Sequence, residues 1–96
     1  MVYVFLADGF EEIEALTPID ILRRAGVSVT SVGVTGKTVT GSHGISVEAD
    51  ITESEAADAL SRADIEAVVL PGGMPGADNL NASSVVEKYI SAALSP

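Results

Sequence analysis

The stretch VYVFLADGFEEIEALTPIDILRRAG, residues 2–26, decides the fold of this chain. It opens with six consecutive apolar residues, 2–7, a run typical of a strand that is buried on both faces of a sheet. An aspartate and a glycine at positions 8–9 end this run. A helical pattern follows over residues 11–26, with two arginines in its last turn and a glycine as its stop. Strand, glycine turn and helix in this order predict the start of a βαβ unit.

Three later regions have the composition of strands. Residues 27–34, VSVTSVGV, are rich in β-branched side chains and follow the first helix directly, as a second parallel strand would. Two short alternating pieces, KTVTG at 37–41 and GISVEAD at 44–50, predict a small hairpin. Residues 67–70, AVVL, are an apolar run that a proline and two glycines stop, so they repeat the theme of the first strand.

Two further helices are indicated by capping boxes. Thr52 with Glu55 precedes one short helix, and Ser84 with Glu87 opens the last one. The order is therefore β-α-β-hairpin-α-β-α, and right-handed crossovers make it a parallel sheet with helices on both faces. We predict a three-layer, mostly parallel, doubly wound α/β fold of the flavodoxin-like or Rossmann-like type, with a small β-hairpin. No repeat or linker divides residues 1–96, so one domain is expected.

The composition of the 96-residue chain limits its chemistry. It is 47% hydrophobic and 20% charged, as in soluble globular proteins with a packed core. Fourteen acidic and five basic residues give a formal charge of -9, which repels nucleic-acid phosphates and anionic membranes, so neither is an expected partner. The chain has no cysteine, which excludes disulfides, thiolate metal sites and thiol nucleophiles within it.

The start of the chain, MVYVFLADG, has no basic residue, and its apolar part is too short for a signal peptide. No apolar run approaches the length of a membrane span. The expected location is the cytoplasm.

Glu14 is separated from its acidic neighbours by helical geometry. It falls on one face with Pro18, Ile21, Leu22 and Ala25, and this face is otherwise apolar. We therefore expect Glu14 to point toward the interior at the carboxyl edge of the sheet. Burying a carboxylate costs free energy unless it is hydrogen-bonded or protonated, and geometry alone leaves open whether this acid is functional.

Glu11 and Glu12 have an ordinary structural explanation. Acids in the first turn of a helix offset its exposed N–H groups and its dipole, so we expect both to be helix-start charges. Pro18 lacks the N–H that would bond the carbonyl of Glu14, which loosens or kinks the turn beside the inward acid.

A glycine pair follows the strand at 67–70. Gly72 and Gly73 lie at the carboxyl end of this strand, where open α/β sheets bind ligands, and paired glycines let N–H groups approach an anion or oxyanion. A tight turn explains the pair equally well by itself. No dinucleotide or phosphate-loop fingerprint is present, so no cofactor is expected. His43 is the single histidine, and we predict a surface-loop residue and no metal site.

LADGFEEIEALTPIDILRRAG, residues 6–26, and VVLPGGMPGADNL, residues 68–80, together resemble the ThiJ/PfpI superfamily over essentially the whole chain. This resemblance implies that Glu14 is an acid held protonated against a reactive cysteine. It also implies that Gly72 and Gly73 supply backbone N–H groups at the same catalytic site. Activities ascribed to the superfamily are glyoxalase III, deglycation of 2-oxoaldehyde adducts, oxidative-stress sensing and chaperone-like holding, and some relatives are proteases.

The sequence departs from the superfamily pattern at its end. The cysteine of such proteins lies on a nucleophile elbow after the next strand, in an ICAAP-like run, and this chain stops before it at SAALSP. We therefore expect residues 1–96 to be an amino-terminal half domain that is catalytically inactive alone. Residues 67–70 would then be an open strand edge, which invites homodimerisation or binding of the missing half. The alternative is a stand-alone oligomeric structural or binding module.

Overall fold

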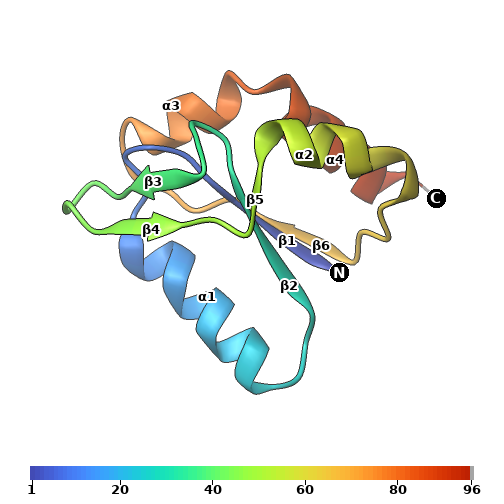
Figure 1. The fold of residues 1–96 in the computed structure, drawn as a ribbon, viewed down its shortest axis with the longest axis horizontal. Helices are drawn as coiled ribbons and strands as arrows, with labels where there is room; N and C mark the ends of the chain where they lie inside the picture. Colours follow the sequence, from blue (N-terminus) through green and yellow to red (C-terminus); the bar gives the residue numbers. More distant parts are fainter. Residues whose placement is uncertain (96) are drawn as a thin grey trace.

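A four-stranded parallel sheet forms the centre of the computed structural model, which describes residues 1–95 (Figure 1). Its strands, in spatial order, are β5 (Ile51–Thr52), β2 (Val29–Gly33), β1 (Val2–Leu6) and β6 (Ala67–Val69). The three pairings are all parallel. The predicted α/β class is confirmed.

Helices cover both faces of this sheet. In Figure 1, α1 (Glu12–Arg24) lies below the sheet, whereas α2 (Glu53–Ala59), α3 (Gly76–Asn81) and α4 (Ser84–Leu94) lie above it. A short 3₁₀ helix, η1 (Leu60–Arg62), extends α2. The three layers agree with the sequence-based prediction. Within residues 1–95 we find no helix with the length and hydropathy needed to span a bilayer.

Alternate side chains of β1 enter two separate hydrophobic clusters. Every residue of this strand is buried, as the unbroken apolar run predicted. Side chains of one parity pack toward α1 and the hairpin, and those of the other parity pack toward α2, α3 and α4. The first cluster contains Val2, Val4, Leu6, Phe10, Ala15, Ile19, Val29 and Val39; the second contains Tyr3, Phe5, Ala7, Val32, Ala56, Leu80, Val86 and Tyr89.

The predicted hairpin is present and docks beside the start of α1. Strands β3 (Thr38–Thr40) and β4 (Ser46–Glu48) pair antiparallel. The N–H of Gly9 donates to the carbonyl of Thr40 at 2.8 Å, and the N–H of Thr40 donates to the Asp8 carboxylate at 3.0 Å. The turn that follows β1 is therefore tied to the end of β3.

Three details of the prediction were incomplete or wrong. Strand β5 has only two residues, too few for a periodic pattern, and no separate sequence signal indicated the six-residue α3. The capping box of Thr52 and Glu55 is confirmed. The cap of α4 is Ser83, not Ser84, because the Ser83 hydroxyl accepts from Val86 N–H at 3.2 Å while donating to Glu53 at 2.7 Å.

The strand β6 lies at an edge of the sheet. Among residues 1–95 its pairing is with β1 alone, and Leu70 just beyond it is 46% exposed. Within the described residues, β6 is therefore an edge strand of the sheet.

Candidate active site

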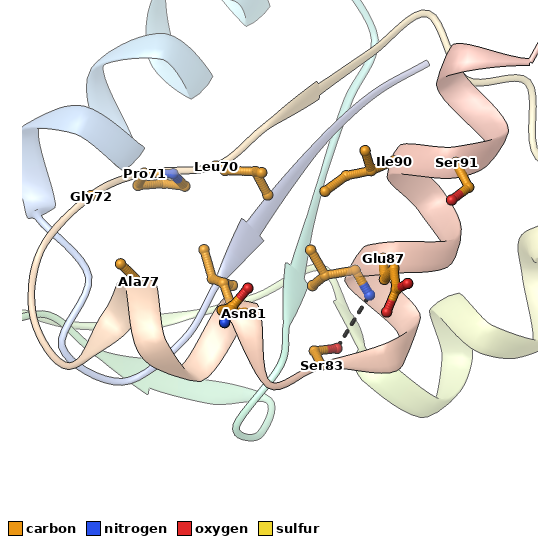
Figure 2. A pocket seen from close by; sticks show the side chains of 11 residues that line it. Leu70, Pro71, Gly72, Ala77, Asn81, Ser83, Glu87, Ile90 and Ser91 are labelled. Atoms are coloured by element: carbon orange, nitrogen blue, oxygen red, sulfur yellow. Dashed lines mark hydrogen bonds between the residues drawn. The ribbon is translucent and has the colours of Figure 1, made fainter.

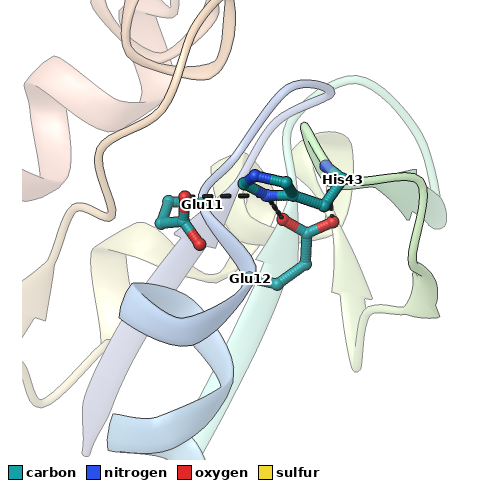
Figure 3. A group of neighbouring side chains, drawn as sticks. All are labelled: Glu11, Glu12 and His43. Carbon is teal, nitrogen blue, oxygen red and sulfur yellow. Dashed lines mark hydrogen bonds and ion pairs between the residues drawn. The ribbon is translucent and has the colours of Figure 1, made fainter.

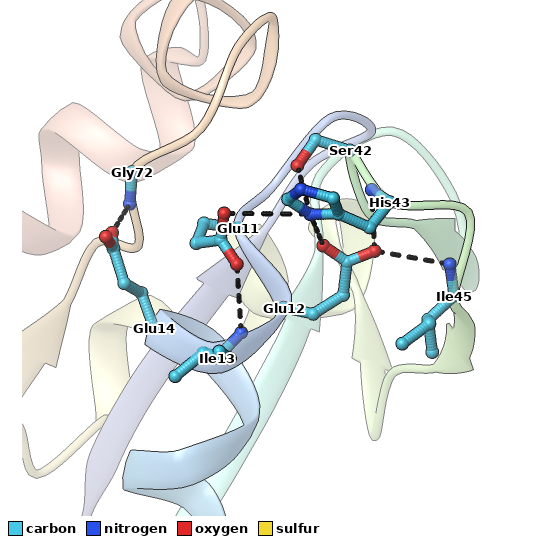
Figure 4. A network of polar contacts seen from close by, with 8 residues as sticks. All are labelled: Glu11, Glu12, Ile13, Glu14, Ser42, His43, Ile45 and Gly72. Carbon is cyan, nitrogen blue, oxygen red and sulfur yellow. Dashed lines mark hydrogen bonds and ion pairs between the residues drawn. The ribbon is translucent and has the colours of Figure 1, made fainter.

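Glu14 contacts Gly72, the first glycine of the pair, at the carboxyl edge of the sheet. The N–H of Gly72 donates to Glu14 Oε1 at 2.7 Å, across 58 residues of sequence (Figure 4). A Cβ added at Gly72 would lie 2.7 Å from the same oxygen, so a glycine allows this close approach. No protein group in residues 1–95 bonds Glu14 Oε2, which leaves this oxygen free for another partner.

The expectation that Glu14 is buried was wrong. Its side chain is exposed in this chain, and Ile21 on the same predicted face is 58% exposed. The buried residues of α1 are Glu12, Ala15 and Ile19, so the inward face is turned by roughly 110° from the predicted one. Apolar residues occur on more than one side of α1, and hydrophobic periodicity therefore did not select the correct face.

The second glycine is the better available backbone donor. The Gly72 carbonyl accepts from Glu11 N–H at 2.9 Å, so both polar backbone groups of Gly72 are bonded to α1 or its cap. Gly73 has φ +96°, a left-handed conformation that favours glycine, and its carbonyl accepts from Ala77 N–H at 2.9 Å. Its N–H has no hydrogen-bond acceptor within residues 1–95. An oxyanion would therefore find Gly73 N–H free and Gly72 N–H occupied.

A mainly apolar cavity of about 430 Å³ adjoins this loop (Figure 2). Its walls come from the end of β6, from α3 and from α4, and they include Leu70, Gly72, Leu80, Val86 and Ile90. Gly72 thus lies between the Glu14 carboxylate and the cavity. The loop that the cavity adjoins follows the carboxyl end of β6, the end of parallel strands where ligand and catalytic sites of such folds occur.

On the other side of the same helical turn, Glu12 is buried under the hairpin. Its Oε2 accepts from the N–H groups of His43 at 2.8 Å and Ile45 at 3.2 Å, and its Oε1 lies 3.0 Å from His43 Nδ1 (Figure 4). The side chain is only 6% exposed. Glu12 is an acid in the first turn of α1, as predicted, but its burial and its bonds to the hairpin were not predicted. Glu11, in contrast, caps α1 by accepting from Ile13 N–H at 3.3 Å, which confirms its helix-start role.

The hairpin turn is shaped around the Glu12 carboxylate. Gly41 is buried, and a Cβ there would lie 2.7 Å from Glu12 Cγ. His43 lies in the loop, with its side chain 69% exposed, as predicted, but one ring nitrogen is engaged by Glu12. The glycines near His43 were the one sequence signal for the contact between Glu12 and the hairpin turn, since a side chain could not approach the backbone so closely at a residue with a Cβ.

Glu12 remains ionised in spite of its burial. Burial alone would raise its pKa, but the hydrogen bond from the His43 ring and those from backbone N–H groups lower the pKa to about 2. The hydrogen bond to Glu12, with the charges of Glu11 and Glu12, raises the pKa of His43 above its usual 6.5. The buried side chain is thus an anion that the hairpin backbone holds in place.

The DJ-1/PfpI family model matches residues 1–95, so both the glycine loop and the first helix lie inside the matched region. The chain belongs to the DJ-1/PfpI family. Its similarity to the Parkinson disease protein 7 homolog of Danio rerio is 40% identity over 88 residues, which cover 91% of this chain and 45% of that protein. It is 38% identical over 71 residues to protein/nucleic acid deglycase 2 of Escherichia coli, covering 73% of this chain and 40% of that protein.

Solved structures of the DJ-1 family share the fold. A DJ-1 superfamily protein from Salmonella typhimurium, solved as a cysteine-to-alanine mutant, superimposes with a TM-score of 0.85 at 40% identity. The match covers 96% of this chain and 48% of that one. The chain therefore spans about half the length of the relatives it matches, as the sequence-based interpretation of a partial domain requires.

Proposed function

We propose that this chain supplies the acid and backbone-donor half of a cysteine-dependent catalytic site. In this proposal Glu14 is the acid, Gly72 N–H holds its carboxylate, and Gly73 N–H is the free backbone donor. The cysteine comes from the carboxyl-terminal half of the family domain. The observation that carries the proposal is the 2.7 Å bond between Gly72 N–H and Glu14 Oε1 beside the cavity at the sheet edge.

The chemistry follows from the free groups at this edge. In this proposal the Glu14 carboxyl group donates a hydrogen bond from Oε2 to the cysteine sulfur and so stabilises the thiolate, which is the reactive form of cysteine. When the thiolate attacks a carbonyl carbon, a C–S bond forms and the carbonyl oxygen becomes negative. The N–H of Gly73 is available to stabilise that oxygen. The substrate class is a small 2-oxoaldehyde or its adduct, as for glyoxalase III and deglycase enzymes.

The chain alone is catalytically inactive in this proposal, because it contains no cysteine. Its working location is the cytoplasm. Thiolate attack on a carbonyl carbon requires no metal or cofactor.

The test is complementation by a separate carboxyl-terminal half. The chain is combined with that half of the Salmonella relative, with its cysteine in place, and loss of methylglyoxal is measured. Activity should appear in the complex and not in either part. Glu14→Gln should abolish it, while the matched exposed control Glu48→Gln should retain it. A folded complex without activity would contradict the proposal.

We also propose that the isolated chain self-associates through the strand edge at residues 67–70. Antiparallel pairing of two copies across a two-fold axis would give one continuous sheet, and the exposed side of α4 could cover the seam. Light scattering of dilute chain should show a dimer or larger species. A stable folded monomer would rule this out.

The alternative function is a stand-alone oligomeric structural or binding module built from the half fold. The same open edge and apolar cavity support it. Self-association that persists when the carboxyl-terminal half is present in excess would favour this module, whereas exchange of the oligomer for a one-to-one complex would favour the catalytic proposal.

A further inference from the structure

Glu11, Glu12 and His43 bring three metal-ligating groups together at a place separate from the cavity (Figure 3). Each offers one ligand atom, and these atoms all lie within 4.8 Å of one another. Two of the groups come from the start of α1 and the third from the hairpin turn. The set contains an imidazole nitrogen as well as two carboxylates, a donor combination that suits zinc and related divalent metals.

Each carboxylate divides its two oxygens in the same way. Glu12 Oε2 accepts from backbone N–H groups of the hairpin, and Glu11 Oε1 accepts from Ile13 N–H. The remaining oxygens both face one atom, His43 Nδ1, with Glu12 Oε1 at 3.0 Å and Glu11 Oε2 at 3.7 Å. Backbone donors therefore hold both acids in position while leaving one oxygen of each directed at the imidazole, as outer hydrogen bonds do around metal ligands.

The two separations between the carboxylate oxygens and His43 Nδ1 are close to those around a tetrahedral ion. Zinc bonds nitrogen and carboxylate oxygen at about 2.0–2.1 Å, so its ligand atoms lie roughly 3.3 Å apart. The two distances to His43 Nδ1 bracket this value. We propose that Glu11, Glu12 and His43 bind one divalent transition-metal ion of the zinc class, with the fourth position open to water.

Access and charge both permit this binding. The His43 side chain is 69% exposed, so an ion reaches the group from solvent, whereas Glu12 forms the buried base of the site. Two carboxylate charges outweigh the positive end of the α1 dipole, which equals roughly half an elementary charge. On binding, the metal takes the Nδ1 lone pair, and a proton on that nitrogen leaves to solvent or moves to Nε2. The Ser42 hydroxyl, now 3.2 Å from Nδ1, gives up that contact.

The composition of the chain makes a spectroscopic test specific for His43. There is one histidine and no cysteine, so imidazole coordination in tag-free protein reports His43 alone. Calorimetric titration of the full 96-residue chain with zinc chloride should show one equivalent bound. Cobalt chloride should give the visible absorption of a tetrahedral ion, and histidine NMR should show the ring signals shift at the same equivalence point.

Single substitutions distinguish a defined zinc site from nonspecific zinc binding by surface carboxylates. His43→Gln and Glu11→Gln, both near the surface, should each weaken zinc binding at least about tenfold. Glu48→Gln, an exposed acid on the same hairpin, should leave it unchanged. Circular dichroism checks that each variant is folded. Absence of zinc binding, or equal binding by wild type and His43→Gln, would overturn the proposal. The test uses no cysteine chemistry, so its outcome is independent of the proposed catalytic function.

Discussion

Glu12 and Glu14 lie two residues apart on one helical turn, yet their surroundings differ in kind. Glu12 is covered by the hairpin turn and accepts from two of its backbone N–H groups, whereas Glu14 is exposed and accepts from Gly72 alone. Which of the two acids is buried therefore depends on where the hairpin turn covers the helix. Glu12 ties α1 to the hairpin, whereas Glu14 ties it to the glycine loop by a single hydrogen bond.

Replacing each of the two acids by alanine should give the largest difference in the free energy of unfolding. Glu12→Ala leaves the N–H groups of His43 and Ile45 without their acceptor, so we expect the largest loss of stability in this set. Glu14→Ala removes one exposed hydrogen bond and should cost at most about 1 kcal/mol. Urea unfolding of both variants measures the difference. Equal losses would mean that the hairpin does not depend on Glu12.

Gly41→Ala tests the same buried carboxylate from the hairpin side. The added methyl group would overlap Glu12, whose side chain is held on both oxygens, so we expect a cost of about 1–3 kcal/mol. The cost should fall in a Glu12→Ala background, because the space is then free. Denaturant unfolding of the four members of this double-mutant cycle gives the coupling. Strict additivity would show that the two positions do not meet.

Gly72→Ala is the matched change on the other side of the turn. Its new Cβ would meet Glu14 Oε1 at 2.7 Å, but that carboxylate is exposed and can rotate away. We therefore expect a loss below about 1 kcal/mol, smaller than for Gly41→Ala. Thermal unfolding compares the two alanine variants directly. The reverse order would indicate that the glycine loop is the more rigid of the two regions.

The sequence predicted the layered fold well because its signals are local. The apolar run of β1, the glycine stop of α1 and the alternation around the hairpin are each readable within about ten residues. It failed to predict the environment of Glu12, since that carboxylate is held by groups 31 and 33 residues away. Helical periodicity showed that the acids point in different directions. It could not show which direction the hairpin would cover.

The smallest expected effect is the pH dependence of the His43 contact with Glu12. The folded pKa of His43 lies above 6.5, so its contribution to stability is fully present below pH 6.5 and is lost as pH rises through the folded pKa. Glu12, with a pKa of about 2, stays ionised throughout that range. In buffer with a metal chelator, wild type should therefore exceed His43→Gln in thermal midpoint at pH 5 to 6, and the gap should close at alkaline pH. The effect is modest because the ring is largely exposed and solvent screens the charge. If the difference in thermal midpoint between wild type and His43→Gln were the same at every pH, His43 would stabilise the fold through a neutral hydrogen bond. The charge that distinguishes this side of the turn from the Glu14 side would then belong to Glu12 alone.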